Sequence, residues 1–397
     1  MKKLIAVIAV LLFVAPAFAA DWSFYGSQRI ASWYQDKDYG SNLGEINGQS
    51  SDASTQLYFQ GNSRLGAKVK ADKITGQIEL GLGQGGDGGD TAVSTRRAYG
   101  VWKFADDASL KVGKDYSPVT DFISNQWFNG DNDLLGEGNF YGRRPSGLTL
   151  IVGNFELAAL TPSYGYLSME SGTNLAATTA TGINGVTGTA QDPDSYIPRF
   201  EASYMLKLGA GYIKPFGGFQ YYTVNQTVNS LPASSVQDDI DVWSYVVGVS
   251  TSWDIGAFSI GGQLSYGMNE GVTQGWSTGS NARASSSPYL NTNGQDIADV
   301  YTIQAMIVPA LKFTDTLRFE AGFGYRVDNP DGAQPRPGAV KNGQPDDMWV
   351  GYLQAMITMA PGVFLCPEVG YYDFMAGPNT GNQGSQWYAG AKWQIDF

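Results

Sequence analysis

The sequence predicts an all-β protein, a transmembrane antiparallel β-barrel of 16 strands. Three observations support this prediction: a secretory leader, strands that are apolar on one face only, and a regular alternation of short turns with long loops. The composition agrees, because 51 glycines, 23 tyrosines, 19 phenylalanines and 10 tryptophans favour strands and tight turns. Charged residues make up 16% of the chain, well below the roughly 25% of ordinary soluble domains.

The first 19 residues have the organisation of a secretory signal peptide. Lys2 and Lys3 form a basic start, and an apolar run of 11 residues follows from Leu4 to Val14. Such a run is too short to span a bilayer as a helix. Ala17-Phe18-Ala19 has the small-residue form of a cleavage site. We therefore expect residues 1–19 to be a signal peptide and residues 20–397 to be a single exported domain.

Apolar and polar residues alternate over many segments of the chain. At the C-terminus, Trp387, Trp393 and Phe397 fall on an apolar face, while Lys392 and Asp396 fall on the other. The same two-residue period recurs over 57–71, 243–253 and 317–328. Because side chains point to opposite faces along a strand, this period predicts strands with one apolar and one polar face.

Seven short turns alternate with eight long polar segments. The turns are expected at Asp72-Lys73, Asp106-Asp107, Asn154, Gly209-Ala210, Asp254-Ile255, Thr314-Asp315 and Ala360-Pro361-Gly362. The loops are expected at 36–54, 85–94, 115–142, 163–195, 226–240, 270–296, 328–346 and 375–384. Fifteen connections join sixteen strands, and the alternation places short periplasmic turns at one end of the barrel and long external loops at the other.

Physical constraints of a membrane favour closure of this sheet into a barrel. Lipid offers no hydrogen-bond partners, so a spanning sheet cannot have free edges. A barrel of this strand number is too wide for side chains to fill, and it leaves an aqueous channel. A soluble sandwich or propeller would show the same period. Two features favour a membrane barrel over these soluble folds. Aromatic residues stand at strand ends, as Trp243 and Trp253 do, and charged residues such as Arg64 stand in mid-strand.

Several function classes are excluded by composition. The chain contains no histidine and a single cysteine, Cys366, so it cannot hold a Ser-His-Asp triad, a Cys-His pair or a His-ligated zinc. No local motif marks a pair of catalytic carboxylates, and we expect no enzyme, no cofactor and no metal centre. An incidental calcium ion at acidic loops, such as 131–137, stays open. With a net charge of −12, no nucleic-acid partner is expected.

Three segments carry a resemblance to a known family. The segments "TQLYFQGNSRLGAKVKAD", "STRRAYGVWKFADDASLKVGKDYSP" and "YGRRPSGLTL" occur in this order. They resemble the first third of the Gram-negative general diffusion porins, with recognisable motifs over residues 55–150. The resemblance implies a homotrimer in the cell outer membrane and passive diffusion of small hydrophilic solutes and ions through a water-filled channel. The second loop is short, whereas in this family it latches onto the neighbouring subunit.

The resemblance also implies a constriction. In this family the third external loop, here 115–142, folds into the barrel, and its carboxylates face arginines across the pore. The loop carboxylates that match this role are Asp115, Asp121, Asp131, Asp133 and Glu137. The matching basic wall residues are Arg64, Arg96, Arg97, Arg143 and Arg144, with Lys68 as a further candidate. Alternation leaves open which member of each Arg-Arg pair points inward. A solvated loop that leaves the pore unconstricted is the alternative.

The last strand supplies two further expectations. Trp393 and Phe397 are expected on the lipid face, and a C-terminal Phe resembles the assembly signal of this class of membrane protein. Outer-membrane lipid and lipopolysaccharide are the expected surroundings. A substrate-specific channel for sugars, nucleosides or organic acids is the second functional reading. Such a channel would need lumen-facing aromatics, for which the candidates are Tyr221/Tyr222, Tyr371/Tyr372 and Tyr164/Tyr166. Neighbouring residues of a strand point to opposite faces, so only half of these tyrosines can reach the lumen. The preference between cations and anions is left open.

Overall fold

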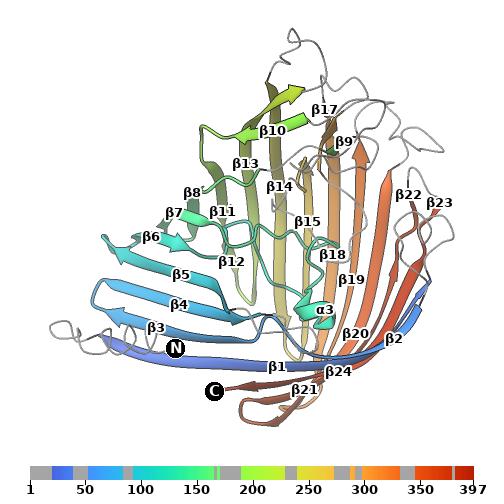
Figure 1. Cartoon of the computed structure of the whole chain (residues 1–397). Coiled ribbons are helices and arrows are strands. Elements are labelled where there is room, and N and C mark those ends of the chain that lie inside the picture. The colour runs from blue at the N-terminus through green and yellow to red at the C-terminus, as the bar shows by residue number, and fades with distance from the viewer. Residues whose placement is uncertain are drawn as a thin grey trace, which may run out of the picture.

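A single curved sheet closes on itself to form the body of the protein (Figure 1). The computed structural model describes residues 20–38, 52–83, 93–164, 168–169, 189–228, 239–271, 287–290, 297–330, 345–377 and 381–397. The predicted signal peptide and most of the second loop lie outside these residues. No helix within the described ranges is long and apolar enough to cross a membrane.

The first half of the wall is built from short strands. The first strand, β1 (Asp21–Asp38), pairs with β3 (Arg64–Ala71) along its N-terminal half and with β2 (Asp52–Phe59) along its C-terminal half. Together β2 and β3 act as one wall strand that is interrupted at residues 60–63. The wall continues through β4 (Ile74–Leu82), β5 (Val93–Lys103), β6 (Ala108–Lys114), β7 (Ser146–Val152) and β8 (Phe155–Leu160).

The second half of the wall is built mostly from long strands. Three short pieces all pair with β13 (Gly211–Val228) and form one wall strand: β10 (Thr189–Asp194), β11 (Arg199–Tyr204) and β12 (Leu206–Leu208). The remaining wall strands are β14 (Ile240–Ile255), β15 (Phe258–Met268), β18 (Val300–Lys312), β19 (Leu317–Pro330), β20 (Asp346–Ala360), β21 (Val363–Asp373) and β24 (Ser385–Asp396). Two small sheets lie apart from the wall: β9 (Ser168–Met169), β16 (Tyr289–Leu290) and β17 (Ile297–Ala298), and the pair β22 (Ala376–Gly377) and β23 (Gly381–Asn382).

Pairing of the last strand with the first closes the barrel. Residues Ser27 to Asp38 of β1 run antiparallel to residues Ser385 to Asp396 of β24. The wall therefore contains 16 antiparallel strands, which confirms the predicted fold. One turn lies two residues later than predicted, because Ile255 still pairs with Phe258. Gly256 makes that turn with a φ of 66°, a conformation that costs glycine little.

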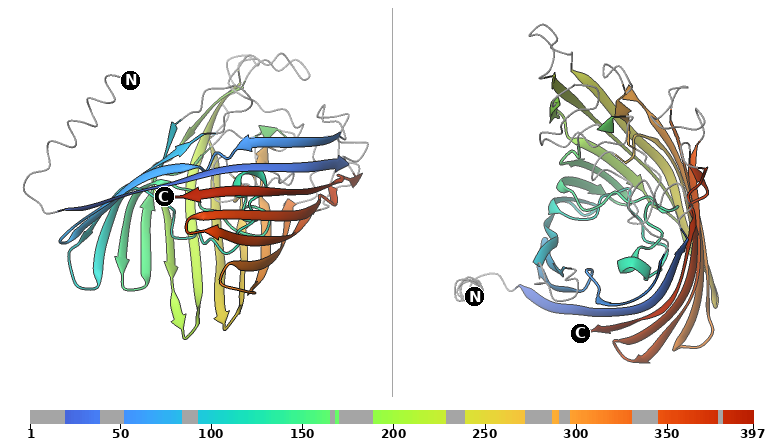
Figure 2. Two further views of the ribbon diagram at one scale, coloured as in Figure 1. Left: turned by 90° about the horizontal axis from the view of Figure 1, so that it is seen from below. Right: turned by 45° about the vertical axis from the view of Figure 1, so that its right-hand side comes forward.

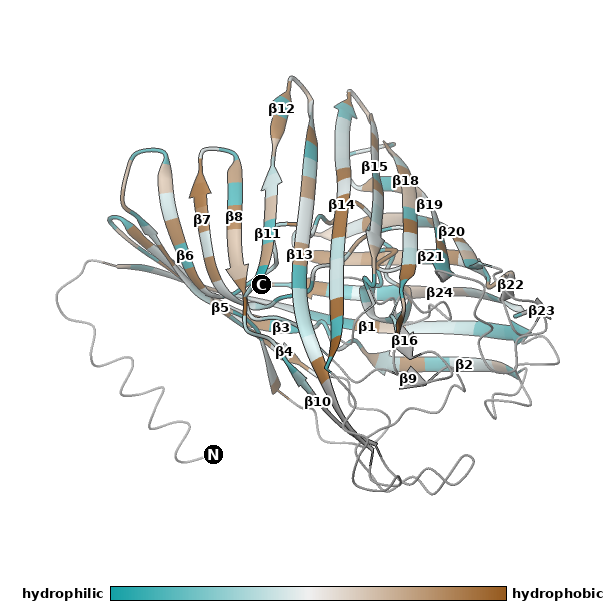
Figure 3. Ribbon diagram, turned by 90° about the horizontal axis from the view of Figure 1, so that it is seen from above, coloured by the Kyte–Doolittle hydropathy of each residue, from teal (hydrophilic) through white to brown (hydrophobic). Residues whose placement is uncertain are grey.

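The outer face of the wall is apolar and the inner face is largely polar. Along β1, Trp22, Phe24 and Ile30 are exposed on the outside, whereas Ala31 and Trp33 are buried on the inside. Figure 3 shows this alternation as hydrophobic and hydrophilic residues that succeed one another along the strands. Buried inward positions include Ser250, Ser265, Gln304 and Gln354. This is the reverse of a soluble sandwich, and it is the arrangement expected for a wall that faces lipid.

Candidate functional site in the barrel lumen

The third long connection folds into the barrel. It runs between β6 and β7 and carries the one-turn helix α3 (Phe128–Asp131), which Figure 2 shows inside the ring of strands. Two inward carboxylates of the wall hold its backbone. Glu320 of β19 accepts hydrogen bonds from the backbone N–H of Asn125 at 2.8 Å and from its side-chain amide at 2.7 Å. Glu368 of β21 accepts from the N–H groups of Trp127 at 2.9 Å and Phe128 at 3.2 Å.

An aromatic cluster packs this loop against the wall. Phe128 stacks on Tyr388 of β24 with ring centroids 3.6 Å apart, and its ring meets Trp33 of β1 edge to face at 5.4 Å. Trp127 is fully buried beside them. The amide of Gln126 donates to the hydroxyls of Tyr372 and Tyr388 at 3.0 and 3.1 Å. The apolar core of the protein thus includes a part inside the barrel, where it fixes the loop.

The loop tip touches β18 and β19 of the wall through glycine. Gly138 has a φ of 129°, and a Cβ at Gly324 of β19 would collide with the carbonyl oxygen of Glu137. Only residues without a side chain allow two backbones to approach this closely. Arg326 also donates to the carbonyl of Gly136 at 3.0 Å. The third loop thus folds into the barrel, as predicted, and its tip is fixed against β19, the strand whose Glu320 also holds Asn125.

A charged cavity of about 570 Å³ remains beside the docked loop. Five cationic side chains and three carboxylates line it: Arg29, Arg64, Arg96, Arg144, Lys392, Asp131, Asp133 and Asp396. Of the six basic wall residues predicted from the sequence, Arg64, Arg96 and Arg144 lie there. Of the five loop carboxylates, Asp131 and Asp133 lie there. Cationic and anionic side chains from the wall and from the third loop thus share one cavity.

A β-bulge in β5 explains why both members of the first Arg-Arg pair, Arg96 and Arg97, reach carboxylates inside the barrel. Glu79 of β4 pairs with Arg97 of β5, and Leu80 pairs with Thr95, so Arg96 is the extra residue. A bulge interrupts the alternation of faces. Arg96 ion-pairs with Glu79 at 2.9 Å, and Arg97 ion-pairs with Asp115 at 2.6 Å. Both arginines therefore reach inward carboxylates.

In the second Arg-Arg pair, Arg144 lines the cavity and Arg143 does not. Arg144 lines the cavity and donates to the Tyr116 hydroxyl at 3.1 Å. Arg143 is not among the residues that line the cavity. Its backbone has a φ of 60°, and burial lowers the pKa of its guanidinium. Lys68 does not line the cavity either. Its ammonium lies 5.3 Å from the ring centre of Tyr25.

The loop carboxylates occupy distinct environments. Asp131 accepts from Lys392 at 3.1 Å and ion-pairs with Arg29. Asp121 accepts hydrogen bonds from the hydroxyls of Tyr212 at 2.8 Å and Ser250 at 2.6 Å, which tethers the loop to β13 and β14. Burial raises the pKa of the cavity-lining Asp133 to about 8, against the opposing charge of Lys392.

Asp115 sits at the base of the loop rather than in the cavity. It ion-pairs with Arg97 at 2.6 Å and with Lys111 at 2.9 Å. Burial acts to raise its pKa, but the Arg97 hydrogen bond and the Lys111 charge together hold it below its ordinary value. Asp115 therefore anchors the loop to the basic wall as an ionised group.

Comparisons with solved structures reveal the same architecture. The outer membrane channel DcaP of Acinetobacter baumannii matches with a TM-score of 0.65 at 15% identity, over 95% of this chain and 97% of that one. The anion-selective porin from Comamonas acidovorans matches with a TM-score of 0.56 at 12% identity, over 95% and 100%. The chain has the porin fold. The trimer form of OmpT, an outer membrane protein of Vibrio cholerae, matches with a TM-score of 0.53 at 14% identity, over 96% and 100%. No family model and no curated protein sequence matches.

Several residues that define the lumen were not singled out from the sequence. Arg29 follows the two-residue period of β1 and could have been found by extending it from Trp33. Glu320 and Glu368 are inward charges in mid-strand, but no local signal shows that they would meet loop backbone some 200 residues away. Lys392, assigned to the inner face by alternation, lines the cavity as expected.

No metal centre is apparent in the ranges described. No three Asp, Glu or Cys side chains group as potential ligands there. Within the acidic segment 131–137, Asp131 is already paired with Arg29 and Lys392. An incidental calcium ion at the acidic loops stays a prediction.

Docking of the third loop is expected to weaken as the pH rises from about 4.5 to about 8. Glu137 is 1% exposed, accepts a hydrogen bond from Asn132, and burial raises its pKa from 4.5 to about 8. The docked loop thus binds a proton that an undocked loop releases above its ordinary pKa. The stabilisation is complete below pH 4.5 and is lost as the pH rises through about 8. The loss amounts to at most about 1.4 kcal/mol per pH unit.

Current noise from single channels measures this effect. Noise should grow between pH 6 and 9 in the wild type and grow less in Glu137→Gln, which is permanently neutral. Asp133→Asn serves as a second variant, because burial also raises the pKa of Asp133. Noise that falls with rising pH in the wild type would contradict the prediction.

Proposed function

We propose that this protein is an outer-membrane porin that forms a water-filled channel for passive diffusion of small hydrophilic solutes and ions. The carrying observation is the charged cavity of about 570 Å³ beside a loop that is fixed inside a closed barrel with an apolar outer wall. Such a wall suits lipid, and such a cavity offers water and fixed charges to a passing solute. The porin fold of its structural relatives supports the proposal.

The proposed assembly is a homotrimer surrounded by lipid and lipopolysaccharide. Strands β6, β7 and β8 have 7, 7 and 6 residues, whereas β13 and β14 have 18 and 16. A tilted strand needs about 9–11 residues to cross the hydrocarbon. The short side of the barrel therefore fits poorly against lipid alone and favours contact with a second copy of the chain. The OmpT relative was also solved as a trimer.

The channel is expected to conduct and to prefer anions weakly. Five cations and three carboxylates line the cavity, and Asp133, with a pKa of about 8, is mostly neutral at pH 7. Reconstitution into planar bilayers tests both statements. In a KCl gradient the reversal potential should favour chloride, and the preference should decrease from pH 7 to pH 9 as Asp133 ionises. Arg144→Gln should shift the reversal potential toward that of a potassium-selective channel.

Two outcomes would contradict these expectations. Correctly refolded protein that forms no conducting pores would refute the channel itself. Cation preference at pH 7 would show that the basic wall does not control the current. Lys207→Gln is a matched control, because Lys207 is exposed on β12 and lies outside the cavity lining.

A further inference from the structure

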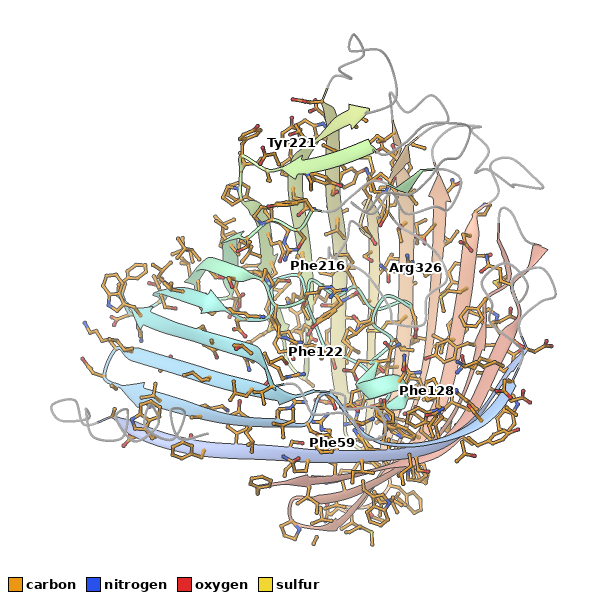
Figure 4. The ribbon with its side chains drawn as sticks, in the orientation of Figure 1. Phe59, Phe122, Phe128, Phe216, Tyr221 and Arg326 are labelled. Carbon is orange, nitrogen blue, oxygen red and sulfur yellow. The ribbon has the colours of Figure 1, made fainter. Side chains whose placement is uncertain are left out.

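An exposed aromatic ring stands in the cavity that the loop leaves open. Phe122 of the third loop is 44% exposed and lines the cavity, and Figure 4 shows it inside the barrel. Three other aromatic side chains of the third loop are at most 2% exposed: Trp127, Phe128 and Phe140. An apolar ring presented to a water-filled passage has an unfavourable contact with water, which a ligand with its own apolar surface would relieve.

Tyr116 connects this ring to the basic wall. Its ring meets Phe122 edge to face at 4.8 Å. Its hydroxyl oxygen accepts from Arg96 at 3.2 Å and from Arg144 at 3.1 Å. The guanidinium of Arg144 also lies 5.1 Å from the ring centre. A phenol oxygen that accepts two hydrogen bonds still carries its own O–H donor, so three donor groups converge beside one exposed ring.

The cationic side of the cavity is not neutralised within the described residues. Arg64 and Arg96 share a single carboxylate, Glu79, at 3.9 and 2.9 Å. Arg144 makes no ion pair with any described carboxylate. Guanidinium groups bind carboxylates in a planar, two-point geometry. Room for an apolar body is also present, because Met356 and Phe364 line the same cavity.

We propose that the cavity contains a binding site for aromatic carboxylates. The carboxylate of the solute binds between Arg144, Arg96 and the Tyr116 hydroxyl, while its ring packs against Phe122. This inference rests on the proposed channel function and adds a class of solute that the channel holds and passes. Charge alone would favour every small anion, whereas the pairing of guanidinium groups with an exposed ring selects anions that carry a ring.

Benzoate is the probe, measured by its interruption of single-channel current in planar bilayers at about 0.1 M KCl, where attraction between charges is only partly screened. Acetate supplies the carboxylate without the ring, and benzylammonium supplies the ring with the opposite charge. We expect benzoate to interrupt the current at a concentration about ten-fold or more below that of acetate. Benzylammonium should not interrupt it. Equal potency of benzoate and acetate would overturn the proposal.

Variants separate the two halves of the site. Phe122→Ser should weaken benzoate about ten-fold and bring it close to acetate, whereas Phe122→Tyr, which keeps the ring, should retain the wild-type affinity. Arg144→Gln should weaken benzoate and acetate alike, and Lys207→Gln should weaken neither. A channel that conducts but treats benzoate like acetate refutes the site and leaves the porin function intact. Absence of conductance refutes the porin function, and benzoate binding to the refolded protein, measured by calorimetry, then tests the site separately.

Discussion

Simultaneous replacement of Glu320 and Glu368 with alanine is expected to release the third loop from its place in the lumen. The two carboxylates accept four hydrogen bonds from Asn125, Trp127 and Phe128. Glu320 also accepts from the Tyr352 hydroxyl at 2.7 Å, and Glu368 from the Tyr388 hydroxyl at 2.7 Å. Both carboxylates are less than 5% exposed. Hydrogen bonds to charged groups contribute about 1.5–3 kcal/mol each, and donors left buried without partners add to the loss.

The expected result is a higher and noisier single-channel conductance. The aromatic cluster around Phe128 still favours docking, so the loop should alternate between docked and released states. Single-channel recording shows this as transitions to a larger conductance level. Glu156→Ala is the matched control, because Glu156 lies on β8 and makes no hydrogen bond with the loop among the contacts described. Unchanged conductance and noise in the double variant would mean that the aromatic cluster alone fixes the loop.

Deletion of Phe397 is expected to reduce the yield of assembled barrel much more than the conductance of the barrels that do form. Gly26 donates to the Phe397 carbonyl at 2.7 Å, and Phe397 donates to the Gly26 carbonyl at 3.1 Å. A Cβ at Gly26 would collide with the Phe397 ring, so the ring lies directly on this glycine at the seam between β24 and β1. Removing the residue shortens the seam and exposes the backbone groups of Gly26, which find no partners in lipid.

Two substitutions test the same seam from either side. Gly26→Val should displace the Phe397 ring, and Trp393→Lys places a charge on the lipid face, which costs about 2–4 kcal/mol at mid-membrane and less near the interface. The fraction of heat-modifiable trimer on unheated gels measures assembly, and single-channel recording measures conductance. Phe104→Ala is a control at an aromatic position far from the seam. Normal amounts of trimer from the seam variants would contradict the role of the terminus.

Much of the fold could be predicted because strand periodicity is local. Side chains alternate across a strand whatever its partners are, so Lys392 and Trp393 could be assigned to opposite faces from the sequence. The strand count could be predicted from the alternation of short turns with long loops. Short turns are recognisable because they need few residues and are rich in residue types such as Gly, Asn and Asp. The resemblance of residues 55–150 to the general diffusion porins added the expectation that the third loop lies inside the barrel.

The arrangement of the candidate site depends on contacts that only the tertiary structure brings together. The bulge at Arg96 disturbs the alternation by one residue and depends on pairing with Glu79 and Leu80. Asn125 meets Glu320 across 195 residues, and Trp127 meets Glu368 across 241. Which loop carboxylates reach the cavity follows from these anchors: Asp131 and Asp133 line it, while Asp115 is held in ion pairs at the base of the loop. The sequence by itself thus determined the strand wall, because the alternation of apolar and polar residues is a property of neighbouring residues. Only the tertiary structure decided the lining of the cavity, because that lining is made of side chains that are distant along the chain.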